Sequence, residues 1–286
     1  RDLRMSRGLG DVYKRQDQVG AYVINYYSYL QNSRQQSLYH DKNWRSGMTL
    51  NDNNTDNLFS QTGDLDYFAG EKQVPSGKNF QTYTSRARVW NWLLEQILPK
   101  EEAGSIQGDK SILSHYIGEA YFFRALAYYQ ALVRYGDFPI IDEVLPDDQA
   151  ILKELSQRAP RNEVARFILK DLDTAISRLK DQGFQNNQRI NKQTAQLLKS
   201  RVALFEATFE KYHKGTGRVP GDDTWPGKDM EYNQGKTFDI AGEINFFLTE
   251  AMSAAKAVAD HCTLTGNSHQ MNPVLGQTSG WNPYFD

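Results

Sequence analysis

The chain has 286 residues, 39% of them hydrophobic and 24% charged, so its composition is that of a globular protein able to bury a sizeable core. The 33 basic residues nearly balance the 35 acidic ones, and a net charge of -2 disfavours a nucleic-acid-binding protein. A single cysteine, Cys262, excludes an intrachain disulfide framework and a cysteine-based zinc cluster. The longest apolar run is about five residues, far below the ~18 that a membrane span needs.

The two ends of the chain differ from the part between them. Residues 1–16 are basic, lack helical periodicity and lack the apolar stretch of a signal peptide. They resemble the translated adapter sequence found at the ends of reading frames from metagenomic assemblies, and a disordered native N-terminus is the alternative. We therefore expect a non-native or disordered leader over 1–16. We expect one helical-repeat domain over 17–286, truncated at its C-terminus.

From residue 17 onwards the pattern is helical. Apolar residues recur at three- and four-residue spacing, and no convincing run of alternating strand residues separates the helical segments. The predicted helices cover residues 18–37, 84–98, 111–135, 161–182, 192–213 and 240–261. The predicted fold class is all-α.

The segment 111–135 is apolar on two faces, which predicts an inner helix of a stack. Gly136 and Pro139 follow it and are typical of a helix end. Arg124 lies on this helix, so we expect a carboxylate or backbone carbonyls to compensate its charge. Glu119 is a candidate partner, although a spacing of five residues suits a helical pair poorly.

A faint repeat relates residues 124–128 to residues 201–205, since both combine Arg, small, apolar and aromatic residues. Their separation is near two periods of the ~34-residue tetratricopeptide unit plus insertions. This predicts tetratricopeptide-like stacked helix pairs with long irregular loops. The loops 41–81 and 214–238 are too long for simple connectors, and we expect them to be functional.

The search for catalytic motifs is negative. The segment that begins at Asp52 lacks the Gly and Glu of an EF-hand, and the one that begins at Gly221 lacks the spacing of a phosphate loop. The five histidines form no zinc-protease motif, and we expect them on the surface or at helix caps. Paired carboxylates such as Asp147/Asp148 and Asp222/Asp223 are expected to be caps and turns rather than a glycosidase pair. We predict no enzymatic activity, no cofactor and no metal site.

One stretch resembles a known family. Residues 118–140 read GEAYFFRALAYYQALVRYGDFPI. They resemble the signature helix of the SusD/RagB family of nutrient-binding outer-membrane lipoproteins, which has an acidic-Ala-aromatic start, an Arg-Ala centre and a Gly-Asp-x-Pro exit. Residues 191–204 and 251–264 resemble the next repeat helices, and 281–286 resemble the aromatic segment after them. The resemblance covers roughly the N-terminal half of a typical member.

The resemblance implies a non-catalytic protein that binds glycans or other nutrients at the extracellular face of the outer membrane. Its implied partner is a SusC-like TonB-dependent transporter, which imports the captured ligand. It is implied to be anchored by a lipid, and we expect the lipid-accepting cysteine to belong to a part missing from this sequence. Two alternatives remain: an intracellular tetratricopeptide-type peptide-binding adaptor, which the long aromatic loops disfavour, and an α-helical glycan-processing enzyme.

Aromatic rings on long loops beside polar residues are the candidate ligand-binding residues, because a ring stacks on the apolar face of a sugar. They are Trp44, Tyr67, Trp225 and Trp281. For each of them, local loop packing is the alternative role. The family gathers binding residues from an early loop and from the segment after the repeat helices, which favours Tyr67 and Trp281. Three tyrosines of the first helix, Tyr22, Tyr26 and Tyr29, lie on one stripe. This favours packing against the core over the alternative, a surface that contacts the transporter.

Overall fold

The computed structural model describes residues 14–30, 54–55, 58–59 and 79–262. The α-helices are α1 (Gln16–Ile24), α3 (Asn79–Glu102), α4 (Lys110–Tyr135), α5 (Gln149–Leu155), α6 (Arg161–Arg178), α7 (Lys192–His213) and α8 (Ile240–Ala259). Short 3-10 helices are η1 (Tyr27–Leu30), η3 (Phe184–Asn187), η4 (Pro226–Asp229) and η5 (Glu231–Asn233). Strands β1 (Asn54–Thr55) and β2 (Leu58–Phe59) form one antiparallel pair. The structure is mostly helical, which confirms the predicted all-α class.

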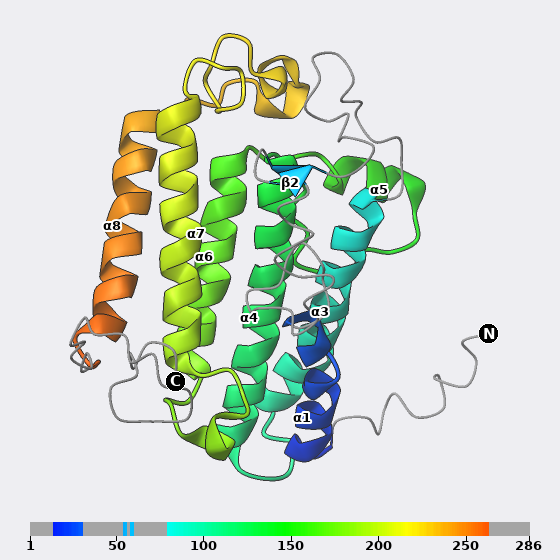
Figure 1. The fold of residues 1–286 in the computed structure, drawn as a ribbon. Coiled ribbons are helices and arrows are strands. Elements are labelled where there is room, and N and C mark those ends of the chain that lie inside the picture. Colours follow the sequence, from blue (N-terminus) through cyan, green and yellow to red (C-terminus); the bar gives the residue numbers. More distant parts are fainter. Residues whose placement is uncertain (1–13, 31–53, 56–57, 60–78, 263–286) are drawn as a thin grey trace, which may run out of the picture.

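The long helices lie side by side (Figure 1). The helices α1 and α3 pack on α4, α4 packs on α6, and α7 lies between α6 and α8. From α3 to α8, the long helices that follow one another in the chain are therefore neighbours in space. This is the arrangement of stacked helix pairs that the sequence predicts.

Helix α4 is buried on both of its apolar faces, from Leu113 to Leu132. The Asp109 carboxylate caps its N-terminus by accepting hydrogen bonds from the backbone N–H groups of Ser111 and Ile112. At the other end Gly136 has a φ of 70° and donates its N–H to the carbonyl of Leu132. The predicted inner helix and its end are confirmed.

Close approach of α4 and α6 depends on Gly118. A Cβ atom at Gly118 would lie 3.0 Å from Cβ of Arg178 and 3.2 Å from the backbone nitrogen of Leu179. Helix α6 ends there, four residues earlier than expected. The N–H of Lys180 instead donates to Nδ1 of His115 at 3.0 Å. A buried side chain of the neighbouring helix thus replaces the helical hydrogen bond.

Aromatic rings join α1 and η1 to the core. Trp90 stacks on Phe123 with ring centroids 5.1 Å apart, and Tyr26 meets Trp90 edge to face at 4.8 Å. Tyr22 packs beside Trp92 at 5.9 Å. Inward packing of Tyr22 and Tyr26 is confirmed, and the side chain of Tyr29 lies outside the described residues.

The predicted helix 18–37 is wrong in its length. Helix α1 ends at Ile24, where the chain tightens into η1, and residues 31–37 lie outside the described part. The hydroxyl of Tyr27 donates to Glu119 and accepts the N–H of Ile190 at 2.9 Å. These contacts come from residues about 90 and 160 positions away in the sequence, so the local pattern gave no sign of them.

Two further helices differ from expectation. Helix α3 runs from Asn79 to Glu102, longer than the predicted 84–98, with Pro99 inside its last turn. Helix α5 was not predicted, because it has only seven residues and none of them is buried. A short helix without a buried face has no hydrophobic periodicity to detect.

The boundary of the leader falls within a described segment. Residues 1–13 lie outside the described part of the chain. The carbonyl of Lys14 accepts the N–H of Gln107 at 2.7 Å, and Gln16 donates its N–H to the carbonyl of Gln107 at 3.0 Å. The division at residue 16 stays a prediction.

Candidate functional site

A pocket of about 440 Å³ lies between the N-terminal half of α3, the segment 141–145 and α5. We call it the α3–α5 pocket. Its polar lining includes Thr84, Ser85, Arg88, Asn91, Glu143 and Ser156. Ala87, Leu145 and Leu152 add apolar surface. Hydroxyl, amide, guanidinium and carboxylate groups beside apolar carbon are what a sugar or another hydroxyl-rich ligand requires.

Asn91 holds the wall of this pocket in place. Its Nδ2 donates to the carbonyls of Ile141 and Glu143, at 2.8 and 3.1 Å. Its Oδ1 accepts from Nη1 of Arg124 at 3.1 Å. Because Asn91 is buried and makes all three bonds, it holds the backbone at Ile141 and Glu143 against the core.

Arg124 anchors this arrangement to the core. Its Nε and Nη2 donate to the two carboxylate oxygens of Asp171 on α6, both at 2.7 Å. Burial raises the pKa of Asp171, and the hydrogen bonds from Arg124 oppose that shift. The hydroxyl of Tyr128 closes the network by donating to the carbonyl of Ile141 and accepting its N–H, each at 2.8 Å.

The exposed side of the pocket carries the groups available to a ligand. Arg88 and Glu143 are both exposed, and the Arg88 guanidinium makes a long contact of 3.5 Å to the carbonyl of Leu145. Opposite charges in one pocket favour a neutral polar ligand over a strongly charged one. No aromatic side chain lines this pocket among the residues that the structure describes.

Of the four predicted binding residues, only Trp225 is described; Trp44, Tyr67 and Trp281 lie outside the described residues. The Trp225 side chain is 3% exposed, and its Nε1 donates to Oδ2 of Asp137 at 2.8 Å. Phe238 meets its ring edge to face, with centroids 5.3 Å apart. A ring this buried offers no face to a sugar. The structure therefore favours the loop-packing role for Trp225, away from the α3–α5 pocket.

The acidic pairs in the described part behave as caps and turns. Asp148 caps α5 by accepting the N–H groups of Ala150 and Ile151. Asp222 accepts the N–H groups of Gly215 and Gly217, which fixes the start of the segment 214–238. Within the described ranges, no three His, Cys, Asp or Glu side chains are grouped in a way that could hold a metal ion.

His115 corrects the expectation of surface histidines. It is fully buried, its Nδ1 accepts the N–H of Lys180, and its Nε2 lies 3.2 Å from a carboxylate oxygen of Glu119. Since Nδ1 is an acceptor, a neutral ring carries its proton on Nε2, which lies beside Glu119 without forming a well-aligned hydrogen bond to it. Sequence reasoning could have noted His115 and Glu119 as an i, i+4 pair on the inner helix.

The sequence analysis named Glu119 as a candidate partner of Arg124. The structure shows that Arg124 pairs with Asp171 instead. Residues five apart on a helix point in directions about 140° apart, so the two side chains face different neighbours. Burial raises the pKa of Glu119, but hydrogen bonds from Arg189 and His115 outweigh burial and leave that pKa below its usual value. Arg189 lies just before α7 and pairs with Glu119 at 2.5 Å.

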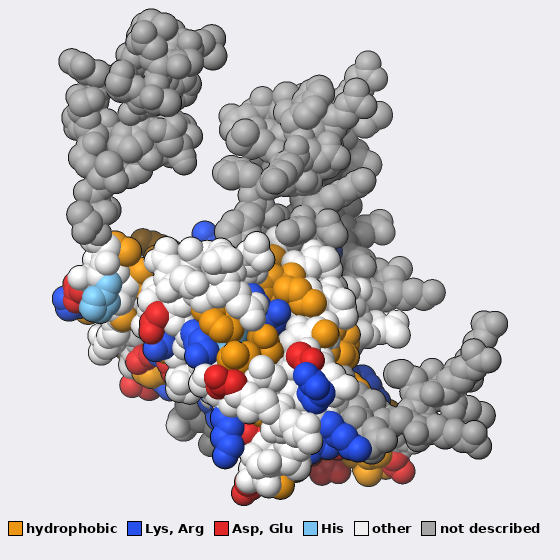
Figure 2. All heavy atoms as spheres, turned by 90° about the horizontal axis from the view of Figure 1, so that it is seen from below, with side chains coloured by type: hydrophobic (Ala, Val, Ile, Leu, Met, Phe, Trp, Pro, Cys, Tyr) orange, Lys and Arg blue, Asp and Glu red, His pale blue; other side chains and the backbone are white. Residues whose placement is uncertain are grey.

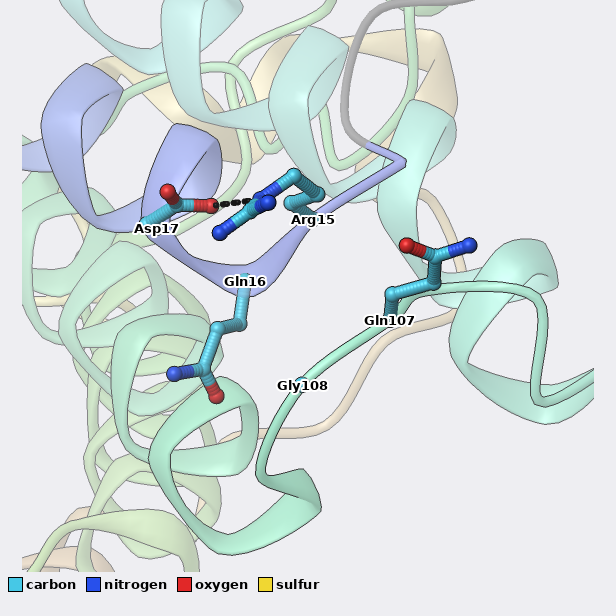
Figure 3. A pocket seen from close by; sticks show the side chains of 5 residues that line it. All are labelled: Arg15, Gln16, Asp17, Gln107 and Gly108. Carbon is cyan, nitrogen blue, oxygen red and sulfur yellow. Dashed lines mark hydrogen bonds and ion pairs between the residues drawn. The ribbon is translucent and has the colours of Figure 1, made fainter.

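A second, smaller pocket of about 300 Å³ lies where α1 meets the turn at Gly108 (Figure 3). Arg15 and Asp17 form an ion pair at 3.1 Å, and Gln16 points away from them. The two charges neutralise each other, and Arg15 and Gln16, which line the pocket, belong to the predicted leader. We regard it as a weaker candidate than the α3–α5 pocket.

Among the residues that the structure describes, the lower ends of the helices show no continuous apolar face. In the view from below, hydrophobic side chains form small groups separated by Lys, Arg, Asp and Glu (Figure 2). Apolar groups of this size are ordinary on a protein surface.

Comparisons with known proteins now place this fold. The sequence model of the family described as "Starch-binding associating with outer membrane" matches residues 12–204, more than half of the chain. The chain belongs to this SusD-like family, as its signature helix indicated. None of the described helices is long and apolar enough to span a membrane.

Individual relatives agree. "SusD-like protein P2" of Formosa agariphila is 33% identical over 109 residues, which are 38% of this chain and 21% of that protein. The solved structure of a SusD-like protein from Bacteroides fragilis is 26% identical with a TM-score of 0.52, over 70% of this chain and 37% of that one. A SusD homologue from Bacteroides thetaiotaomicron is 17% identical with a TM-score of 0.54, over 88% and 42%, which supports the fold alone. The chain thus spans less than half the length of these relatives.

Proposed function

We propose that this protein binds glycans or other nutrients at the extracellular face of the outer membrane and passes them to a SusC-like TonB-dependent transporter. The match of residues 12–204 to a starch-binding, outer-membrane-associated family carries the proposal. The same proposal includes attachment of the whole protein to the membrane through a lipid and the lack of enzymatic activity.

The α3–α5 pocket is our proposed ligand contact within the described residues. Its hydroxyl, amide and charged groups can exchange hydrogen bonds with sugar hydroxyls, and Asn91 keeps the wall rigid. A wall that needs no rearrangement lowers the cost of binding. Trp44, Tyr67 and Trp281 remain our proposed stacking residues, whereas Trp225 is no longer among them.

The peptide-adaptor alternative receives less support. The segment 214–238 is tied down by Asp222 and Trp225 as an elaborate cap over the helix ends, whereas adaptors join their helices by tight turns. Figure 1 shows this segment in yellow at the upper ends of α7 and α8.

Calorimetric titration with starch-derived maltooligosaccharides and a panel of other soluble glycans tests the proposal. Replacing the exposed Glu143 by Ala removes a hydrogen-bond acceptor but leaves its backbone carbonyl for Asn91. We expect affinity for the bound glycan to fall about tenfold, since a hydrogen bond to a charged group contributes ~1.5 kcal/mol or more. Glu154→Gln, on an exposed position of α5 outside the pocket lining, is the control and should bind as the wild type does.

Two outcomes would count against the proposal in different ways. Unchanged affinity of Glu143→Ala would move the site away from the α3–α5 pocket while leaving glycan binding intact. Failure of the whole panel to bind would overturn glycan binding itself.

A further inference from the structure

Glu210 is a buried acid without a partner. It lies in the last turn of α7, its side chain is fully buried, and neither carboxylate oxygen has a hydrogen-bond partner. An ionised carboxylate in such a position would lose its hydration without compensation. The glycan-binding proposal assigns no role to this residue.

The charged groups around Glu210 are already committed to one another. Helix α6 contributes Arg161 and Arg166, α7 contributes Glu206, and α8 contributes Glu243. Arg161 donates to both oxygens of Glu206 at 2.7 and 2.8 Å, and Arg166 donates to both oxygens of Glu243 at 2.9 Å. Three carboxyl groups therefore share two guanidinium groups, and both guanidinium forks are occupied.

Aromatic rings limit any rearrangement of these arginines. The guanidinium carbon of Arg161 lies 3.3 Å from the ring centroid of Phe209, and that of Arg166 lies 3.8 Å from the ring centroid of Phe246. Neither arginine can turn to Glu210 without leaving both its carboxylate and its ring. A proton on Glu210 is the simplest way to balance the charges.

We propose that Glu210 is a proton latch: its carboxyl is neutral in the folded protein, and loss of that proton loosens the junction of α6, α7 and α8 from which the segment 214–238 departs. Burial raises the pKa of Glu210 to about 8, and the charges of Glu206 and Glu243 act in the same direction.

The junction connects Glu210 to the segment in two ways. The carbonyl of Glu210 accepts the N–H of Lys214, the first residue of the segment, at 3.0 Å. Arg161 donates its own N–H to Asp137 at 2.9 Å, and Asp137 also accepts Nε1 of Trp225 within the segment. An ionised Glu210 would compete with Glu206 for Arg161 and so disturb both attachments.

The direction of the pH effect follows from where the proton is held more tightly. The carboxyl has an ordinary pKa of 4.5 when the chain is unfolded and one of about 8 when it is folded. Glu210 therefore costs no stability below pH 4.5, and stability falls as the pH rises toward 8. Over that range this single group raises the unfolding constant by up to about tenfold per pH unit.

Thermal unfolding of the 286-residue chain between pH 5 and 9 tests the latch with Glu210→Gln, an uncharged isostere. The wild type and the control Glu154→Gln should lose stability as the pH rises to 8, whereas Glu210→Gln should lose clearly less. Hydrogen exchange, corrected for its intrinsic pH dependence, should show that 214–238 loses protection at pH 9 in the wild type and keeps it in the variant.

An infrared spectrum of the ¹³C-glutamate-labelled wild type gives a readout that does not depend on the variant. A protonated carboxyl band at pH 7 that disappears near pH 8 to 9 would support the latch, even if Glu210→Gln fails to fold. Absence of that band at pH 7, or a variant whose pH profile matches the wild type, would overturn it.

Discussion

Buried charged residues in this protein join one helix to the next. Arg124 of α4 pairs with Asp171 of α6, and Arg161 of α6 pairs with Glu206 of α7. In both pairs the arginine donates two hydrogen bonds to one carboxylate. Such a fork fixes orientation as well as charge, so each pair sets how its two helices lie against each other.

Replacing Asp171 by Asn should strongly destabilise the protein. The change leaves the buried Arg124 guanidinium without a counter-charge, for which a loss of ~3 to 5 kcal/mol is typical. Urea unfolding followed by circular dichroism measures it. Asp173→Asn, on the exposed side of the same helix, should cost no more than about 1 kcal/mol.

The double variant Arg124→Met with Asp171→Leu separates pairing from packing. Because both charges are removed together, we expect it to recover much of the loss. A stability of Asp171→Asn equal to that of the wild type would show that Arg124 does not depend on Asp171.

At the scale of elements, the segment 214–238 behaves as part of the scaffold although it contains only the short helices η4 and η5. Asp222 organises its first turn and Trp225 reaches Asp137, which also accepts the N–H of Arg161 at the start of α6. The segment is therefore attached to α6 as well as to the two helices that it connects.

Trp225→Phe should weaken this attachment without disturbing ligand binding. The ring that packs on Phe238 is largely kept and one hydrogen bond to Asp137 is lost, which costs ~1 kcal/mol. Hydrogen exchange should increase across 214–238 and stay unchanged in α3 and α4. The exposed Tyr212→Phe is the control, with no expected change. A weaker glycan affinity with unchanged exchange would instead return Trp225 to the binding site.

At the scale of the whole molecule, ion pairs run across the stack from end to end. Arg178 of α6 pairs with Glu101 of α3, Arg166 of α6 pairs with Glu243 of α8, and Lys199 of α7 contacts both Asp173 of α6 and Glu250 of α8. These pairs are partly exposed and Lys256–Asp260 lies on the surface, whereas the Arg124–Asp171 and Arg161–Glu206 pairs are buried.

Salt should therefore have little effect on stability. At about 1 M NaCl the Debye length shrinks to ~3 Å, which screens exposed pairs but hardly reaches buried ones. The unfolding midpoint between about 0.1 and 1 M should change less than it does on the substitution Asp171→Asn. A salt-induced drop as large as that substitution causes would mean that surface pairs hold the stack together.

Much of the fold could be predicted from the sequence because long amphipathic helices carry their own periodicity. Helix α7 begins and ends where the pattern predicts, and α4 ends at Gly136 as expected. These features depend on residues near one another in the chain: cap residues, helix formers and apolar spacing. The same local stretch, 118–140, was sufficient to indicate the family.

The tertiary structure decided what depends on distant residues. Tyr27 ends α1 early because Glu119 and Ile190 are presented to it, and Arg124 chooses Asp171 over Glu119 because α6 lies on that side of α4. Likewise Trp225 is buried because Asp137 and Phe238 enclose it. From the sequence alone, a loop tryptophan beside aspartates was equally compatible with a ring that stacks on a sugar. Partner choice and burial are set by which side chains the fold brings within a few ångströms, and no local pattern contains that information.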